Sequence, residues 1–353
     1  MAYTDIDDPT AYFQCKIFTG TGNSLAITFD GNSDMQPDLV WVKARESNAY
    51  TNNHALVDVI RGVGKVLSSD RNVGTQNEPQ SVTAFGSDGF TLGTSPVWNA
   101  ASLLAVAWSW KAGTSFTNDA SSTGIGSIDS TGSVSTDAGF SIVTFTGNSG
   151  SIAHGLAQKP AMVIIKPRNV SGSWIVTHKG LGAEMQDYYL FLDTTAAKAT
   201  SNDIWGGEPT STTFSVSSSL IDSANYVAYS FAEKKGYSKF GSYTGNGTDN
   251  NGTFVYTGFK PAWLMVKRTD STSDWSMYDI KREAANPQYE FDLQLEANDN
   301  AAEGSDGQLG MYSNGFKLRS SDAFLNASGA TYIYMAFAEN PFVTSTGVPA
   351  TAR

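Results

Sequence analysis

The stretch Gln36-Pro37-Asp38-Leu39-Val40-Trp41-Val42-Lys43 places a proline six residues before a lysine, with four apolar residues directly before that lysine. The same arrangement recurs at 159–166 (Lys-Pro-Ala-Met-Val-Ile-Ile-Lys) and at 260–267 (Lys-Pro-Ala-Trp-Leu-Met-Val-Lys). Consecutive apolar residues give both faces of a strand apolar side chains, so such a strand is covered on both sides. Proline lacks the N–H that a central ladder needs and marks the start of the strand. Each copy is therefore predicted to be the central strand of a sandwich.

Two further patterns accompany each copy of the proline–lysine stretch. An aromatic-Thr-Gly triplet precedes each proline, at 18–20, 145–147 and 243–245. Three alternating apolar residues close each copy: Leu104, Val106 and Trp108, then Val227, Tyr229 and Phe231, then Ile333, Met335 and Phe337. The proline lies 71, 71 and 76 residues before the last aromatic (108−37, 231−160, 337−261). This spacing predicts three tandem units of about 100 residues.

The turn chemistry predicts the fold class of these units. Asp-Gly or Asn-Gly precedes an aromatic strand at 88–90 and 314–316, which is a hairpin signal. The chain is therefore predicted to be all-β, with three tandem antiparallel β-sandwich repeats of lectin or jelly-roll type. Their expected bounds are 1–112, 139–235 and 236–342, followed by a C-terminal tail at 343–353. Each repeat is expected to hold its own core, which predicts an array of domains.

A segment rich in Gly, Ser and Thr, at 113–138, separates the first two repeats. Its composition buries too little apolar surface to offset the entropy of ordering. We expect an arm that is ordered by a neighbouring repeat or another copy, with Ile125, Ile128 and Val134 as its apolar contacts. A plain flexible linker is the alternative.

Charge and cysteine content exclude several classes of protein. The formal net charge of −11, without a basic run, argues against a nucleic-acid partner. Cys15 is the only cysteine, so no intrachain disulfide can form. Residues 1–20 lack a basic start and an apolar centre, which predicts no signal peptide. No apolar run reaches the length of a membrane helix, so no membrane insertion is expected.

An acidic residue and an arginine recur at one spacing in the first and third repeats. Asp58 and Arg61 lie four and seven residues after His54, and Asp279 and Arg282 lie at the same distances after Trp275. A catalytic carboxylate is one interpretation, but a glycosidase needs two carboxylates. The second repeat has a histidine and a leucine at these positions. We therefore predict two structural ion pairs.

No other pattern predicts catalytic, cofactor-binding or metal-binding residues. The loop Asp30-Gly31-Asn32-Ser33-Asp34 has the alternating oxygen ligands of a calcium site. Met35 and Trp41, however, occupy the positions of the required glycine and glutamate. The three histidines are far apart in sequence and no Cys/His spacing suits zinc. No Gly-x-Ser-x-Gly motif marks a nucleophilic serine, so the chain is predicted not to be an enzyme.

Aromatic residues are the remaining candidates for a binding surface. Trp41, Trp108, Trp263 and Tyr229 fall on core positions of the repeats and are expected to pack inside. Less regular stretches hold the four residues that we predict as a contact surface: Trp98, Trp205, Tyr188 and Tyr312.

The chain resembles the repeat-bearing virion structural proteins of marine tailed bacteriophages, of the tail-fibre type. The resemblance lies in the stretches 6–14 (IDDPTAYFQ), 27–34 (ITFDGNSD), 108–113 (WSWKAG), 154–156 (HGL), 239–247 (KFGSYTGNG) and 336–342 (AFAENPF). It implies a component of the virus particle with lectin-like sandwich domains, and it leaves the place on the virion open. We predict a non-enzymatic component of the tail or fibre apparatus, made in the host cytoplasm. The implied partners are other virion proteins, further copies of the chain in the particle, and host-surface polysaccharide. A capsid-surface decoration protein and a polysaccharide depolymerase are the alternatives.

Overall fold

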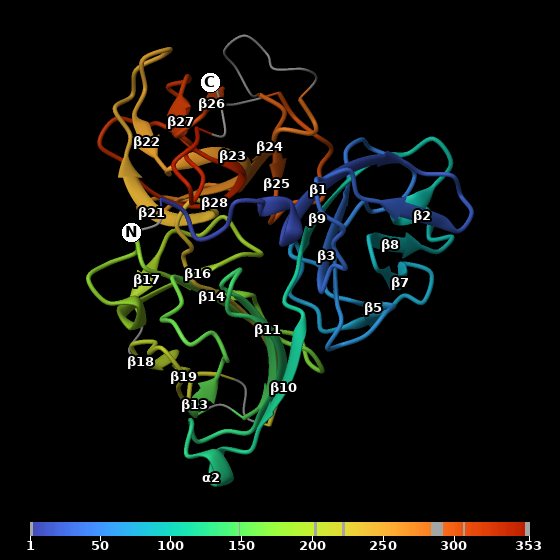
Figure 1. Cartoon of the computed structure of the whole chain (residues 1–353), viewed down its shortest axis with the longest axis vertical. Coiled ribbons are helices and arrows are strands. Elements are labelled where there is room, and N and C mark those ends of the chain that lie inside the picture. Colours follow the sequence, from blue (N-terminus) through green and yellow to red (C-terminus); the bar gives the residue numbers. More distant parts are fainter. Residues whose placement is uncertain are drawn as a thin grey trace.

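The regular secondary structure of the chain consists almost wholly of antiparallel strands, which confirms the predicted all-β class (Figure 1). The structure is a computed structural model that describes residues 3–147, 149–200, 203–220, 223–283, 292–305 and 308–349. We divide it into unit 1 (13–110), unit 2 (114–231) and unit 3 (238–341). None of the described helices is long and apolar enough to cross a membrane.

Each unit packs a large sheet against a smaller one. Unit 1 contains β1 (Phe13–Thr19), β2 (Leu25–Thr28), β3 (Leu39–Ala44), β4 (Ala55–Asp58), β5 (Lys65–Val66), β6 (Gln76–Asn77), β7 (Val82–Gly86), β8 (Gly89–Leu92), α1 (Pro96–Asn99) and β9 (Leu104–Trp110), after η1 (Pro9–Ala11). Unit 2 contains β10 (Thr114–Asn118), α2 (Ala120–Thr123), β11 (Ser130–Ser135), β12 (Phe140–Thr146), β13 (Gly150–Ala153), β14 (Met162–Pro167), β15 (Ile175–His178), η2 (Met185–Asp187), β16 (Tyr188–Phe191), β17 (Ala199–Thr200), β18 (Trp205–Gly207), β19 (Thr213–Val216) and β20 (Asn225–Phe231). Unit 3 contains β21 (Ser238–Thr244), β22 (Phe254–Tyr256), β23 (Phe259–Arg268), β24 (Trp275–Asp279), β25 (Leu295–Glu296), β26 (Leu309–Tyr312), β27 (Gly315–Leu318) and β28 (Thr331–Pro341).

The strand order is the same in all three units. The large sheets contain the runs β1-β9-β3-β4, β12-β20-β14-β15 and β21-β28-β23-β24. The small sheets run β2-β8-β7, β13-β19-β18 and β22-β27-β26. The proline–lysine strands β3, β14 and β23 each lie inside a large sheet, as their apolar faces predict, and no residue of β3 or β14 is exposed.

The register corrects one sequence match. The residues opposite the three lysines are Val106, Val227 and Ile333. Trp110 therefore corresponds to Phe231 and Phe337, whereas the sequence match had placed Trp108 there. A shift of two residues keeps every side chain on the same face, so alternation alone cannot detect it.

The predicted array of separate domains is wrong, because the three large sheets share one core. Ile142, Met265 and Trp108, from three different units, belong to a single buried apolar cluster at the centre of the molecule. A separate cluster fills each sandwich between its large and small sheets. Figure 1 shows the small sheets at the periphery and the large sheets facing the middle. Both faces of each lysine strand are thus buried, one inside its own sandwich and one against the other units.

The segment at 113–138 is ordered within the chain. Strands β10 and β11 form a hairpin that pairs with β12 and extends the large sheet of unit 2. Ile128 packs against the core of unit 2 and Val134 is buried. Ile125 is 39% exposed and makes none of the core packing predicted for it. The hairpin gains its order from backbone pairing, which a composition of small residues does not reveal.

Three lysines tie the units into a ring. Lys43, Lys166 and Lys267 are fully buried at equivalent positions of their strands. Each Nζ donates to a carbonyl of its own unit and to a carbonyl of a neighbouring unit. The neighbouring acceptors are Asn300 and Ala301 for Lys43 (3.2 and 2.7 Å), Arg71 for Lys166 (3.2 Å) and Thr195 for Lys267 (3.1 Å). Unit 1 thus binds unit 3, unit 3 binds unit 2, and unit 2 binds unit 1.

Beside each lysine, the ring N–H of a Trp or His side chain makes a further hydrogen bond to the same neighbouring unit. Trp174 Nε1 donates to Ser68 O of unit 1 at 2.8 Å, and Trp275 Nε1 donates to Phe191 O of unit 2 at 2.9 Å. In unit 1 the position belongs to His54, whose Nδ1 accepts from Trp41 Nε1 at 2.8 Å. Its Nε2 therefore carries the proton and lies 2.9 Å from Glu296 O of unit 3. Burial lowers the pKa of His54 well below its usual value, which keeps this donor neutral.

We expect the buried lysines to make stability rise with pH between about 8 and 9.5. Burial lowers the pKa of Lys267 to about 8. Above that pH the unfolded chain binds more protons than the folded chain, so the free energy of unfolding increases. The Lys267→Met variant should show a shallower rise than the natural sequence, by up to about 1.4 kcal/mol per pH unit. Guanidinium unfolding of both proteins across this range measures the difference, and parallel pH profiles would contradict the charge assignment.

Candidate functional site

The two predicted ion pairs are present, and each also joins two units. Arg61 Nε donates to Asp58 Oδ2 at 2.6 Å, and Arg282 Nε donates to Asp279 Oδ2 at 2.6 Å, with side chains almost fully buried. Tyr229 of unit 2 donates its hydroxyl to Asp58 at 2.7 Å. Trp108 of unit 1 donates Nε1 to Asp279 at 3.0 Å. These carboxylates act as structural acceptors and are closed to substrate.

The same contacts explain why unit 2 lacks the ion pair. His178 takes the place of Asp58 and Asp279, opposite the first residue of strand β14. Met335 takes the place of Trp108 and Tyr229 in the register of unit 3. A thioether has no N–H or O–H to donate, so a carboxylate facing it would lack that partner. His178 Nε2 instead lies 3.1 Å from Tyr334 O of unit 3.

Two of the four predicted contact residues are core residues. Trp98 is 4% exposed and donates Nε1 to Asn53 O at 2.7 Å, and Trp205 is 3% exposed in the core of unit 2. The prediction of a surface role for both is wrong, because irregular sequence around a tryptophan does not mean irregular packing. Tyr188 and Tyr312 are half-buried, each beside a cation, Lys198 for Tyr188 and Arg319 for Tyr312. The structure does not bring these four residues together.

The calcium-like loop has a different partner from the one its pattern suggests. Asp30 pairs with Lys16 at 3.1 Å and with Lys281 of unit 3 at 3.0 Å. Partial burial acts to raise the pKa of Asp30, but the two ammonium groups outweigh burial and lower this pKa. No group of three or more His, Cys, Asp or Glu suited to a metal occurs among the residues that the structure describes.

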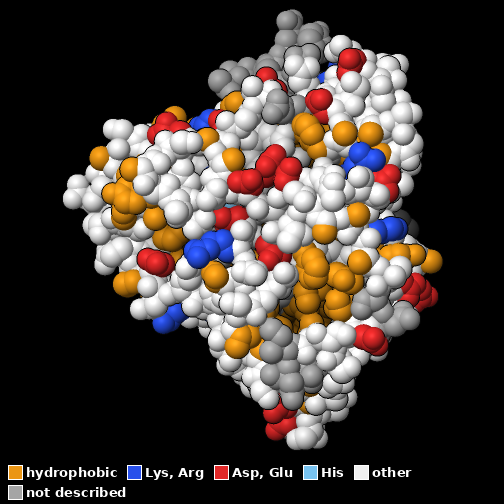
Figure 2. All heavy atoms as spheres, turned by 180° about the vertical axis from the view of Figure 1, so that it is seen from behind, with side chains coloured by type: hydrophobic (Ala, Val, Ile, Leu, Met, Phe, Trp, Pro, Cys, Tyr) orange, Lys and Arg blue, Asp and Glu red, His pale blue; other side chains and the backbone are white. Residues whose placement is uncertain are grey.

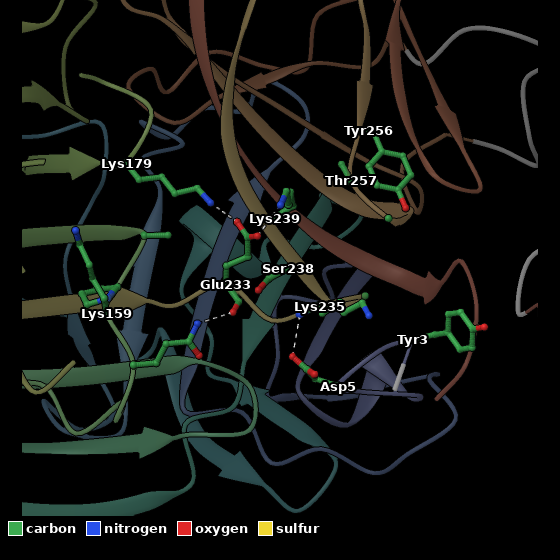
Figure 3. Close-up of a pocket in the computed structure, with 15 residues that line it drawn as sticks. Tyr3, Asp5, Lys159, Lys179, Glu233, Lys235, Ser238, Lys239, Tyr256 and Thr257 are labelled. Atoms are coloured by element: carbon green, nitrogen blue, oxygen red, sulfur yellow. Dashed lines mark hydrogen bonds and ion pairs between the residues drawn. The ribbon is translucent and has the colours of Figure 1, made fainter. Parts of the chain in front are cut away.

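An open cavity of about 600 Å³ lies where unit 2 meets unit 3 (Figure 3). We call it the 2–3 cleft. Its walls come from the start of β14, the end of β15, the linker at 233–239, the N-terminal segment and the β22–β23 turn. The lining residues are Tyr3, Asp5, Gln158, Lys159, Pro160, Ala161, Lys179, Glu233, Lys235, Gly236, Ser238, Lys239, Tyr256, Thr257 and Gly258.

Local structure fixes the floor of this cleft. The linker turns at Gly236, whose φ of +78° favours glycine, and a Cβ there would lie 2.0 Å from Thr4 Oγ1. Thr4 Oγ1 donates to Lys235 O at 2.8 Å, and Lys235 N–H donates to Asp5 Oδ2 at 3.0 Å. The N-terminal segment is therefore fastened across the linker and completes the wall.

One carboxylate organises the lysines of the cleft. Glu233 pairs with Lys179 and, at 2.6 Å, with Lys239, as Figure 3 shows. Burial acts to raise the pKa of Glu233, but hydrogen bonds from both ammonium groups outweigh burial and lower this pKa. Gln158 Nε2 donates to Glu233 O at 3.0 Å. Lys159 pairs with Glu208 and keeps half of its side chain exposed.

An equivalent cleft between units 3 and 1 is smaller, about 200 Å³. It is lined by Ala262 and Glu339, which correspond to Ala161 and Glu233, and by the loop at 30–32. The β2–β3 connection spans 29–38, and Gln14 Oε1 accepts from Gly31 N at 2.9 Å to hold it in the cleft. The β22–β23 connection is only 257–258 and leaves the 2–3 cleft open.

The sequence analysis did not identify the lysines and tyrosines of the 2–3 cleft. Lys159, Lys179, Lys235 and Lys239 come close together because β14, β15 and β20 are neighbours in the sheet of unit 2 and the linker to unit 3 directly follows β20. Two features could have drawn attention to them: seven lysines from 159 to 239 in an acidic chain, and a β22–β23 turn much shorter than its counterpart in unit 1.

Comparison with known proteins gives a family and no closer relative. No curated protein and no solved structure matches the chain. One family model matches residues 8–341, which include all three units and their shared core. The chain therefore belongs to the family described as "Domain of unknown function (DUF7483)".

Proposed function

We propose that the chain is a non-enzymatic structural component of a tailed-phage virion, located on the tail or fibre apparatus. The sequence stretches that resemble such virion proteins support the virion assignment. The observation that supports a structural role is that the buried charged and hydrogen-bonding side chains make contacts between units. The buried carboxylates Asp58 and Asp279, the buried lysines and the ring N–H donors all hold one unit to the next. Such a ring supplies a rigid block for assembly.

A capsid-surface decoration protein is the second candidate. The α-helices of the described residues span only four residues each, so this part of the chain offers no coiled-coil stalk for a long fibre. A compact ring suits attachment to a shell as well as to a tail.

Imaging of whole particles separates these two candidates. Antibody against the purified chain should label the tail or fibres, and the ring should fit density there. Labelling of the capsid lattice would favour the decoration protein, and absence from purified particles would overturn both. Release of reducing sugar from host polysaccharide by the purified chain would favour a depolymerase instead.

A further inference from the structure

We infer that the 2–3 cleft binds an acidic saccharide, a sugar chain that carries carboxylate or sulfate groups. This inference rests on the proposed function together with a host-surface role, the contact with host polysaccharide that the sequence resemblance implies. It adds a site and a ligand class to that role.

The charge of the cleft is opposite to that of the protein. Four lysines and two carboxylates line it, and Glu208 pairs with Lys159, so the ammonium groups exceed the carboxylates by one (4−3) in a chain of formal net charge −11. On the face seen in Figure 2, acidic side chains gather near the middle and basic side chains lie in small separate groups. A cavity whose net charge has one sign attracts ligands of the other sign. The excess of ammonium groups therefore selects an anion.

Aromatic side chains mark the rim of the same cleft. Of the large apolar side chains that the structure describes, Tyr3 and Tyr256 are the most exposed, at 61% and 60%. Both line the 2–3 cleft, and in Figure 3 both lie on the side away from Lys159. Exposed tyrosine rings without a packing role combine a flat apolar face with a polar end, which suits a surface that contacts ligand.

Lysines next to exposed tyrosine rings favour an acidic sugar over anions that have no apolar face. A sugar ring has an apolar C–H face that stacks on tyrosine, and its hydroxyls suit the exposed side-chain amide of Gln158 on the wall. The carboxylate or sulfate then replaces water around the lysine ammonium groups. The volume of about 600 Å³ lies in the usual range of ligand sites and leaves room for two or more sugar rings.

The equivalent cleft between units 3 and 1 provides an internal comparison. Its loop at 30–32 occupies the opening, and Asp30 supplies the anion that pairs with Lys281. The chain thus fills one cleft with its own carboxylate loop and leaves the other open. An acidic sugar is proposed to take in the 2–3 cleft the place that Asp30 takes in its counterpart.

Calorimetric titration of the full chain with three tetrasaccharides tests the inference. The probes are a uronic acid tetrasaccharide, a sulfated neutral-sugar tetrasaccharide and the same tetrasaccharide without sulfate. We expect at least one acidic probe to bind more tightly than the neutral one, and its affinity to fall as salt rises. Which acidic probe binds identifies the anionic group. Equal binding of the neutral probe, or no binding of any probe, would overturn the inference.

Matched variants assign the binding to this cleft. Tyr256→Ala and Lys159→Ala should each weaken the acidic probe about tenfold. Phe254→Ala removes an exposed ring two residues away on the same strand, outside the cleft lining. Lys260→Ala removes the lysine before the equivalent proline of unit 3. These two controls should bind as the natural sequence does, and equal affinity in all four variants would place the site elsewhere. Because the titration uses no particle, its failure leaves the virion assignment to be judged by imaging.

Discussion

Replacing Asp279 with alanine is expected to lower the free energy of unfolding of the whole chain by about 3–5 kcal/mol. The carboxylate accepts from Arg282 Nε at 2.6 Å, from the backbone N–H groups of Arg282 and Lys281 at 2.9 and 3.0 Å, and from Trp108 Nε1. Its loss leaves the buried Arg282 without its closest counter-charge. Because Trp108 belongs to unit 1, the damage extends beyond unit 3.

Guanidinium unfolding followed by tryptophan fluorescence and by circular dichroism measures this effect. Asp30→Ala is the matched control, since Asp30 also pairs with two cations but is about half exposed. That control should cost no more than about 1 kcal/mol. If Asp279→Ala were as mild as Asp30→Ala, the pair would not hold the units together.

Trp110→Ala is expected to have an effect of similar size, about 3–5 kcal/mol. Trp110 is 1% exposed, and its ring lies 5.0 Å from Phe13, 5.6 Å from Trp263 and 6.4 Å from Phe231, which belong to units 1, 3 and 2. Removing the indole opens a cavity at the point where all three large sheets meet. We expect the variant to unfold in one transition at lower denaturant, with fluorescence and circular dichroism changing together.

Trp110→Phe separates lost volume from lost polarity. The indole Nε1 has no hydrogen-bond partner among the described residues, and the equivalent positions hold Phe231 and Phe337. The phenylalanine variant should therefore cost clearly less than the alanine variant. Separate transitions for separate units in either variant would contradict a shared core.

The fold class could be predicted from the sequence because local patterns determine it. Val40, Ile164 and Leu264 are buried in their strands as the apolar runs predict, and the Asp58 and Asp279 ion pairs follow from their spacing to arginine. The ring could not be predicted in the same way. An apolar strand face indicates burial, but it does not show whether a second sheet of the same unit or a neighbouring unit covers it.

The candidate site could not be predicted from the sequence, for a related reason. The walls of the 2–3 cleft come from the N-terminal segment and from both adjoining units, so no single stretch of sequence carries its pattern. Tyr256 is the last residue of the short strand β22 and resembles any surface tyrosine. Trp98 and Trp205 lie in irregular stretches of sequence, which predict a surface role but do not reveal that both side chains are buried.

The closed ring also limits how the protein can be built into something larger. Each unit offers one side to the unit before it and another to the unit after it, which is a head-to-tail interface. The three interfaces bury both of these sides on every unit, so the same contact cannot bind a fourth unit from another chain. Neighbouring proteins must attach through the outer sheets or the clefts. The number of units is thereby fixed within the chain, and growth of an assembly depends on surfaces that the three units do not share.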